Sequence, residues 1–359
     1  MSRPRSPGET PGRSEALAFA CPAPLPPGDR VLLGHGSGGR LSADLVRTVF
    51  QPALGDPELA RLGDAAVVEI GGNRLAFTTD GFVVQPPFFP GSDIGALAVN
   101  GTVNDLAVVG ARPECLSAAF ILEEGFAIDG LGRIAKSMGE ACEDAGVRLV
   151  AADTKVVERG SADGIFVVTS GIGSVPEGVS IGPQHIRPGD TVLVSGPVGT
   201  HGVAVMSRRA GTGFDVDVGS DTAPLTGLVE AMLTAGSVRC LRDATRGGVA
   251  TVLNELAAVA DVTIEVDDDA VPVLEPVRAA CATLGLDPLY VANEGVCVAA
   301  VAAADVDAVL AAASAHPLGT GAAVIGRIEA GPASVHLRTG LGTTRPLLML
   351  AGDQLPRIC

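Results

Sequence analysis

The chain has 359 residues, of which 47% are hydrophobic and only 3% aromatic, with no Trp, so its core must be built from Ala, Val, Leu and Ile. That length is enough for two domains of ordinary size. The formal net charge of -16 argues against nucleic acid or an anionic membrane as a partner, but it is compatible with a nucleotide held through Mg²⁺.

Residues 1–30 are rich in Pro, Gly, Ser and Arg and lack the apolar stretch of a signal peptide, so we expect a disordered N-terminal extension. Nowhere does an apolar stretch reach the length of a membrane span without an interrupting Gly, Asn or charge. The seven cysteines are scattered, with no C-x-x-C pair. That pattern favours a reducing, cytoplasmic location over a disulfide framework.

Residues 31–183 are predicted to form a first domain that mixes strands and helices. A glycine-rich stretch at 34–39 leads into a helical pattern at 41–50. The pattern at 94–109 is also helical, with small apolar residues around an embedded Asp105. Further patterns predict strands at 66–70, 74–79, 116–122, 148–152 and 165–170, and a helix at 131–145.

The polar stretch Arg187-Pro188-Gly189-Asp190 marks the start of a second domain, which we assign to residues 184–340. Neither half alternates strictly between strand and helix. This favours the α+β class, with two mixed-sheet domains that each carry helices on one face. In the second domain, strands are predicted at 191–195, 262–266, 296–301, 323–328 and 335–338, and helices at 203–209, 249–260, 274–283 and 305–313.

Residues 341–359 are predicted to form a separate, mobile tail that ends on Cys359. Pro356 cannot occupy a helix interior and biases Leu355 toward an extended conformation, so we expect a projecting arm tipped by a thiol. By position alone, the same residues also fit a frayed end that happens to finish in Cys.

Four aspartates form a set that suits a metal ion: Asp64, Asp80, Asp105 and Asp153. Asp64 precedes a predicted strand, Asp80 and Asp153 close strands, and Asp105 lies in a helix that should otherwise be buried. Each alone fits an ordinary turn or cap. Isolated buried charges are costly unless they are paired or coordinate a metal, so as a set they predict Mg²⁺ and, with it, a nucleoside triphosphate.

Two glycine motifs are candidates for binding phosphate. Each leads into a predicted helix, whose N-terminus favours anions, and Arg246 could bind phosphate through two bonds. Alternatively, the first is a flexible loop and the second a helix cap made by Asp243 or Thr245. Asn104 either contributes to binding or satisfies buried backbone. The motifs are His35-Gly36-Ser37-Gly38-Gly39 and Asp243-Ala244-Thr245-Arg246-Gly247-Gly248, from which we select Gly36, Ser37, Gly38, Gly39, Thr245, Arg246, Gly247 and Gly248.

Two further residues are candidates for catalysis. Lys155 follows Asp153 by two residues, so it could stabilise a transferring phosphoryl group or an oxyanion; otherwise it is a solvated surface Lys. Glu294 lies in an apolar stretch, where a raised pKa would let it act as a base; otherwise it belongs to a turn.

Taken in order, these motifs resemble the HypE family of hydrogenase maturation factors, in the superfamily of aminoimidazole ribonucleotide synthetase and selenophosphate synthetase. The resemblance covers residues 31–359, and its specific element is the terminal Pro356-Arg357-Ile358-Cys359. It implies a homodimer paired through the N-terminal domains, with ATP near the interface. It also implies that a HypF-type enzyme carbamoylates the terminal thiol, that ATP-dependent dehydration yields S-cyanide, and that a HypC–HypD complex receives the cyanide on iron.

Applied to these residues, the resemblance implies that the four aspartates hold Mg²⁺ and ATP and that Cys359 carries the substrate. Lys155 would stabilise the carbamoyl oxygen or the phosphoryl group, Glu294 would be the base, and His35 is a second candidate for carrying a proton. Two alternatives stay open. One is a selenophosphate synthetase, against which Cys21 has no Lys nearby. The other is a non-catalytic scaffold that binds ATP.

Overall fold

The computed structural model describes residues 30–209, 216–350, 352, 355 and 357–359. Cys21, Pro356 and the predicted extension up to residue 29 lie outside the described residues. Every helix and strand of the described residues belongs to one unit, Leu32–Cys359. No helix within the described ranges has both the length and the apolar character needed to cross a membrane.

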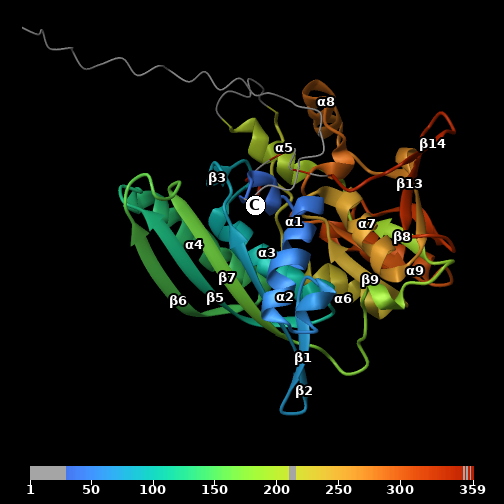
Figure 1. Cartoon of the computed structure of the whole chain (residues 1–359), viewed down its shortest axis with the longest axis horizontal. Coiled ribbons are helices and arrows are strands. Elements are labelled where there is room, and N and C mark those ends of the chain that lie inside the picture. Colours follow the sequence, from blue (N-terminus) through green and yellow to red (C-terminus); the bar gives the residue numbers. More distant parts are fainter. Residues whose placement is uncertain (1–29, 210–215, 351, 353–354, 356) are drawn as a thin grey trace, which may run out of the picture. The chain divides into compact units, whose positions relative to one another are not determined.

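The first sheet has five strands in the order β1-β2-β7-β5-β6, and only the β5–β6 pair is parallel (Figure 1). A two-residue turn, Gly71-Gly72, joins β1 to β2; both glycines have positive φ, as this type of hairpin requires. The strands are β1 (Ala66–Ile70), β2 (Asn73–Phe82), β5 (Arg112–Glu123), β6 (Arg148–Val157) and β7 (Ile165–Ser174).

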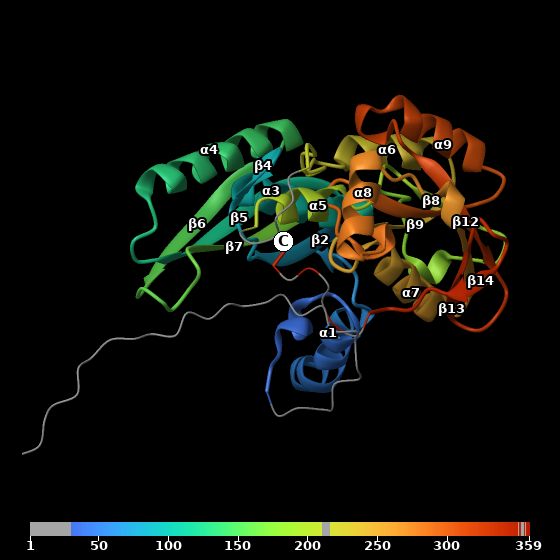
Figure 2. The ribbon, with the colours of Figure 1, turned by 90° about the horizontal axis from the view of Figure 1, so that it is seen from above.

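Helices α3 (Ile94–Val108) and α4 (Ile128–Ala145) cover one face of this sheet (Figure 2). The Asp93 carboxylate caps α3 by accepting the backbone N–H groups of Gly95 and Ala96. Nearly every residue of α3 is buried, as its apolar pattern predicts. The opposite face is open: Phe77 and Ile172, which pair across β2 and β7, are 47% and 41% exposed. Apolar side chains left open in this way make the face a candidate for an interaction.

The second sheet has seven strands in the order β14-β13-β10-β12-β8-β11-β9. Its helices lie on both faces, with α7 on one side and α6 and α9 on the other (Figure 2). The elements are β8 (Thr191–Val194), β9 (Val238–Asp243), β10 (Thr263–Asp267), β11 (Cys297–Val301), β12 (Ala323–Glu329), β13 (Ser334–Arg338), β14 (Thr344–Pro346), α6 (Thr226–Ala235), α7 (Gly248–Ala260) and α9 (Val306–Ala315).

The expectation of helices on one face is therefore confirmed for the first sheet and wrong for the second. In β11 every residue is buried, because alternate side chains enter two different cores: Val298 packs with α7 and Ala299 with α6 and α9. A continuous apolar strand is the signature of a sheet covered on both faces.

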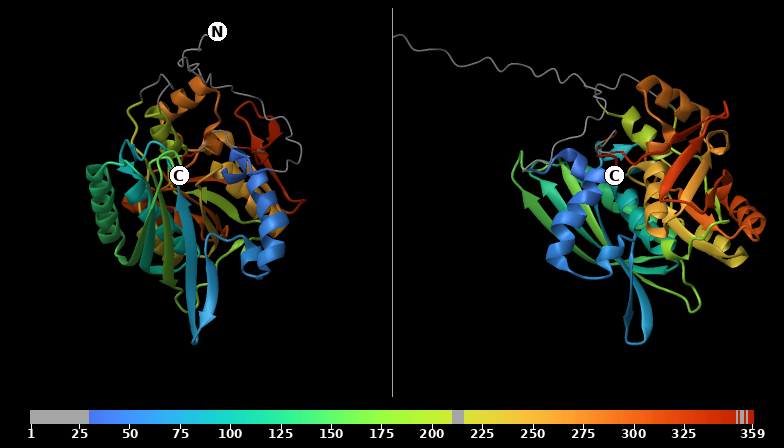
Figure 3. Two further views of the ribbon diagram at one scale, coloured as in Figure 1. Left: turned by 60° about the vertical axis from the view of Figure 1, so that its left-hand side comes forward. Right: turned by 45° about the vertical axis from the view of Figure 1, so that its right-hand side comes forward.

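The remaining elements lie outside the two sheets and the helices that cover them. Helices α5 and α8 pack together, and a helical segment from α1 to α2 lies apart from both sheets (Figures 2 and 3). The tail predicted from residue 341 first adds β14 to the second sheet before it turns inward. The elements are α1 (Arg40–Leu45), a π-helix (Val46–Phe50), α2 (Gln51–Leu54), β3 (Phe88–Phe89), β4 (Ser92–Asp93), α5 (Thr200–Ser207) and α8 (Glu275–Leu284).

Candidate active site

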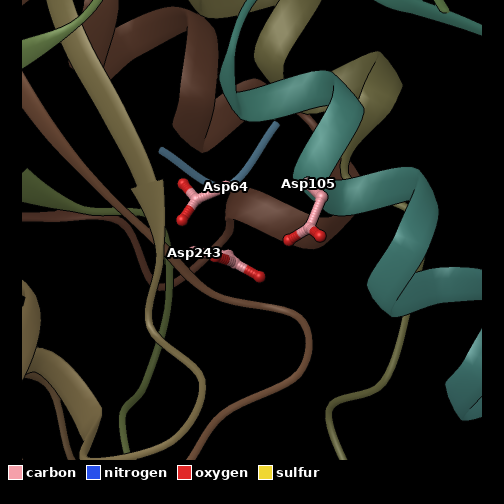
Figure 4. Close-up of side chains that lie close together, drawn as sticks. All are labelled: Asp64, Asp105 and Asp243. Carbon is pink, nitrogen blue, oxygen red and sulfur yellow. The ribbon is translucent and has the colours of Figure 1, made fainter. Parts of the chain in front are cut away.

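Three carboxylates converge between the two sheets, where the chain offers a possible metal site (Figure 4). Asp64 precedes β1, Asp105 lies on α3, and Asp243 ends β9. One oxygen from each lies within 4.8 Å of the others. Hard oxygen ligands brought together in this way suit Mg²⁺.

The electrostatics of this cluster favour a cation. Burial, followed by the charges of Asp243, Asp80 and Asp64, raises the pKa of Asp105 well above its ordinary value. Burial, followed by the charge of Asp64, raises the pKa of Asp243 in the same way. Arg242 binds Asp64 at 2.9 Å. This single guanidinium leaves the cluster with surplus negative charge, which a divalent cation would neutralise.

The stability of the folded protein should therefore depend both on pH and on bound metal. Because the folded pKa values of Asp105 and Asp243 lie above their unfolded values near 4, their contribution is present below about pH 4 and is lost as pH rises through the folded pKa values. We expect the metal-free protein to lose stability as pH rises over this window. Mg²⁺ and ATP at about 100 times their Kd should restore about 2.7 kcal/mol.

Thermal unfolding of Asp243→Asn checks this expectation, since the amide keeps the shape but removes the charge. The variant should lose most of the gain from Mg²⁺ and ATP, and its metal-free stability should depend less on pH. Asp144→Asn, on the exposed surface of α4, is the matched control. An unchanged Mg²⁺·ATP gain in Asp243→Asn would remove Asp243 from the site.

The cluster borders a cavity of about 260 Å³ that also holds the end of the chain. Asp80 lies on β2 and lines the cavity, and its carboxylate is 3.9 Å from the Arg246 guanidinium. Burial raises the pKa of Asp80, and Arg246 opposes that rise. The cavity is lined by Gly38, Asp64, Thr79, Asp80, Gly101, Asp105, Arg242, Asp243, Thr245, Arg246, Thr251, Val252, Glu255, Glu294 and Cys359.

Glu294 has the features of a buried base. It is 3% exposed, and its Oε1 has no hydrogen-bond partner among the described residues. Burial, followed by the charges of Asp243 and Asp80, raises its pKa well above the ordinary value. A carboxyl group with an unpaired oxygen and a raised pKa, next to a substrate-sized cavity, fits a proton acceptor.

The two glycine motifs come together at this cavity. Gly38 has φ +76°, and a Cβ there would lie 2.9 Å from the Arg246 Cβ, so only glycine fits. The Arg246 Nη1 donates to the Gly36 carbonyl at 3.2 Å. Gly38, Thr245 and Arg246 line the cavity, and Ser37, Gly39 and Gly247 line a smaller adjoining pocket. Gly248 lies at the start of α7, where its Cα faces the Leu289 carbonyl.

The chain's last residues lie inside this site, although the sequence predicted a projecting arm. Leu355 and Ile358 are 9% and 3% exposed and belong to the core around α5 and α8. The Val83 N–H, just beyond β2, donates to a terminal carboxylate oxygen of Cys359 at 3.2 Å. The Cys359 side chain lines the cavity, and the negative charge of this residue is the largest cause of a raised pKa at Arg246. Cys359 therefore borders the acidic site of its own chain.

Four predicted site residues lie elsewhere. Asp153 and Lys155 pair with each other on β6, where their side chains are 65% and 69% exposed, and the described residues that line the cavity include neither. The His35 ring accepts the Leu32 N–H, away from the cavity. Asn104 uses its amide to bind the backbone of Ala223, Leu225 and Glu294, which is the alternative of satisfying buried backbone.

Asp243 was not predicted as a metal ligand. It stands directly before Ala244-Thr245-Arg246-Gly247-Gly248, where a helix cap explains it equally well. The structure ends β9 on it instead and pairs it with Cys297 of β11. Its position at a strand end is the signal that could have found it, because the same reasoning identified Asp80.

Residues 62–175 match the N-terminal domain, and residues 187–337 the C-terminal domain, of AIR synthase related proteins. A carbamoyl dehydratase HypE from Rhizobium leguminosarum is 50% identical over 333 residues, 92% of this chain and 95% of the relative.

Among solved structures, HypE in a HypE–HypF complex has a TM-score of 0.81 at 45% identity, covering 86% of this chain and 99% of that one. HypE in complex with ATP has a TM-score of 0.77 at 46% identity, covering 92% and 100%. With this identity over nearly the full length of its relatives, and with the cavity and terminal Cys described above, the chain belongs to the HypE family of carbamoyl dehydratases.

Proposed function

We propose that this protein uses ATP to dehydrate a carbamoyl group on its own Cys359 to S-cyanide, a source of the cyanide ligand in [NiFe]-hydrogenase assembly. One observation carries the proposal: the terminal Cys359 lies in the same cavity as the acidic cluster and Glu294. A substrate attached to this thiol would meet both groups. Its relatives are carbamoyl dehydratases, and one of them binds ATP.

The residues present fit Mg²⁺ and ATP. Asp64, Asp105 and Asp243 would hold the metal, since their clustered, buried charges otherwise repel one another. Asp80 borders the same space. Mg²⁺, when bound, would neutralise phosphate charge. Arg246 and the backbone of Gly38 and Thr245 would bind the phosphates.

The chemistry explains the need for ATP. The oxygen of an S-carbamoyl group is a poor leaving group, so transferring the terminal phosphoryl group of ATP onto it turns it into phosphate. The first N–H proton passes to water as the oxygen is phosphorylated, which leaves a C=N–H group and ADP. Breaking the C–O bond as the second N–H proton departs then leaves the nitrile and phosphate. Glu294 accepts one of these protons through its unpaired Oε1.

The proposal requires partners. A HypF-type carbamoyltransferase loads Cys359, in agreement with the relative seen in a HypE–HypF complex. A HypC–HypD complex then accepts the cyanide. The tail must leave its cavity for both encounters and return for dehydration. Because the reaction needs a reduced thiol, we place the protein in the cytoplasm.

We also propose a homodimer formed through the open face of the first sheet. Strand register puts Asp153 and Lys155 on the same open face as Phe77 and Ile172. Pairing two such faces would bury these apolar side chains and present Lys155 to the second copy. Lys155 would then serve the neighbouring site and not its own.

Ile172→Asp should therefore dissociate the dimer, because a carboxylate buried without a partner costs several kcal/mol. We expect the dimer Kd to rise by about a hundredfold or more, corresponding to about 2.7 kcal/mol. Light scattering after gel filtration measures it. The control is Val259→Asp on α7, a site 55% exposed. A Val259→Asp monomer alongside an intact Ile172→Asp dimer would move the interface away from the sheet.

Intact-mass spectrometry tests the proposed activity directly. With a HypF-type transferase, carbamoyl phosphate and ATP, Cys359 should first gain a carbamoyl group. Addition of Mg²⁺ and ATP to the loaded, repurified protein should then remove one water. Loading without subsequent loss of water would contradict the dehydratase, and the absence of any adduct on Cys359 would contradict the substrate assignment.

A further inference from the structure

The tail is held in its cavity by main-chain hydrogen bonds and by the Arg357 side chain, which donates to the Val83 carbonyl and pairs with Asp163. Three consecutive residues each accept a hydrogen bond on a main-chain oxygen: the Arg357 carbonyl from the Gln85 N–H and the Arg209 guanidinium, the Ile358 carbonyl from His201, and a terminal carboxylate oxygen of Cys359 from the Val83 N–H. Two of these bonds resemble the addition of a short strand to the segment beyond β2. The middle bond comes from a side chain, so a single substitution can remove it.

His201 is built into the interior. It is 0% exposed and lies on α5, with its ring edge-on to Phe89 at 5.4 Å between centroids. Its Nε2 lies 2.9 Å from the Ile358 carbonyl and its Nδ1 lies 2.8 Å from the Ser220 hydroxyl. A carbonyl can only accept, so Nε2 carries the hydrogen and, in the neutral ring, Nδ1 accepts from Ser220. Burial lowers the pKa of His201 to about 4, which keeps the ring neutral near pH 7.

The same residue is connected to the candidate base. The buried Asp221 carboxyl group accepts the Glu294 N–H at 3.1 Å, and the His201 main-chain amide is close enough to lower its pKa. Asp221 therefore borders both the backbone of the residue that binds the tail and the backbone of Glu294.

We propose that His201 is a positioning residue: its Nε2–H binds the Ile358 carbonyl and so places the group on Cys359 against Glu294 for dehydration. The proposal rests on the proposed function for the identity of the group on Cys359. The hydrogen bond between His201 and Ile358, however, is present in the unloaded protein. His201 touches neither the reacting atoms nor the nucleotide, and it acts through the tail.

Two matched substitutions separate the hydrogen bond from the bulk of the side chain. His201→Gln can place an amide N–H where Nε2 was, whereas His201→Asn places its amide at the Nδ1 position and leaves the Ile358 carbonyl unpaired. The readout is iodoacetamide labelling of Cys359 in the full-length, unloaded protein, measured on the C-terminal peptide. Partly exposed Cys115 gives the internal reference.

His201→Asn should raise the labelling rate of Cys359 relative to Cys115 by at least about fivefold, because a buried acceptor left unpaired weakens the docked state. His201→Gln should stay near the natural rate. Equal rates in all three proteins, or an equal rise in both variants, would overturn the proposal. Should His201→Asn fail to fold, Ser220→Ala, which frees Nδ1, should give a smaller rise, and no rise would overturn the proposal too.

The rates of carbamoylation and of dehydration then distinguish a positioning role of His201 from general damage to the fold. Carbamoylation of Cys359 requires an outward tail, so His201→Asn should load at least as fast as the natural protein while the loaded protein dehydrates more slowly. Equal losses in both steps would indicate damage to the fold and overturn the positioning role. If the natural protein itself loads but never loses water, the proposed function fails. The labelling comparison would still decide whether His201 holds the tail in its cavity.

Discussion

Replacing Cys359 by alanine should abolish carbamoylation, and with it any cyanide, while leaving the fold and ATP binding intact. Cys359 lines the cavity but lies outside the candidate metal cluster, which consists of Asp64, Asp105 and Asp243. The terminal carboxylate stays in place, so the charge opposite Arg246 is retained in part. Intact mass after incubation with a transferase, carbamoyl phosphate and ATP should show no adduct. Calorimetric titration with Mg²⁺ and ATP should give a Kd within about threefold of the natural protein, since no bond to the nucleotide is removed.

Cys115→Ser is the matched control, because Cys115 is also partly exposed but lies on β5 away from the cavity. It should load and dehydrate normally. If Cys359→Ala still carries a carbamoyl group, another thiol is the carrier. If it instead loses ATP affinity by a large factor, the thiol is part of the nucleotide site and not a substrate carrier.

Glu294→Gln should slow dehydration by about a hundredfold to ten-thousandfold, the usual contribution of a general base. Loading of Cys359 by the transferase should be unaffected, because that step takes place in another protein. The amide has nearly the shape of the carboxyl group, and burial already raises the pKa of Glu294 by disfavouring its charged form, so packing should hold. Single-turnover loss of water, followed by mass spectrometry on pre-loaded protein, measures the effect.

The pH dependence gives a second signature of Glu294. Its raised pKa means that the deprotonated form grows as pH rises through the folded pKa of Glu294, so the natural dehydration rate should rise with pH over that window and Glu294→Gln should lose that rise. Stability has the matching sign: a carboxyl group with a raised folded pKa loses its contribution as pH rises, and the amide does not. Dehydration at the natural rate in Glu294→Gln would assign proton removal to Lys155 or to water.

Much of the fold could be predicted because its signals are local. The helix expected at 94–109 is α3, and the strand expected at 66–70 is β1. By contrast, α6 and β9 were not predicted; β9 mixes two arginines and an aspartate into a short apolar strand. The same omission hid Asp243, because its meeting with Asp64 depends on how distant strands pair, which no local pattern shows.

The two largest departures concern placement. Lys155 was predicted at a strand end, but β6 continues to Val157 and leaves it on an exposed sheet face. The tail was predicted to project, yet it docks because its main-chain oxygens find donors at Val83, Gln85 and His201. Main-chain oxygens are common to every residue, so this part of the docking leaves no mark in the sequence, and the buried Ile358 is its side-chain counterpart.

A tail seated in its own cavity also sets the kinetic order of the reaction. The carbamoyl group on Cys359 would be presented at a local concentration fixed by the tether, which dilution of the protein cannot change. Dehydration should then be first-order in loaded protein, with no saturation by substrate and one turnover for each loading. The overall rate in a cell would be set by how often a transferase and an acceptor draw the tail out, so the supply of cyanide would follow the abundance of those partners.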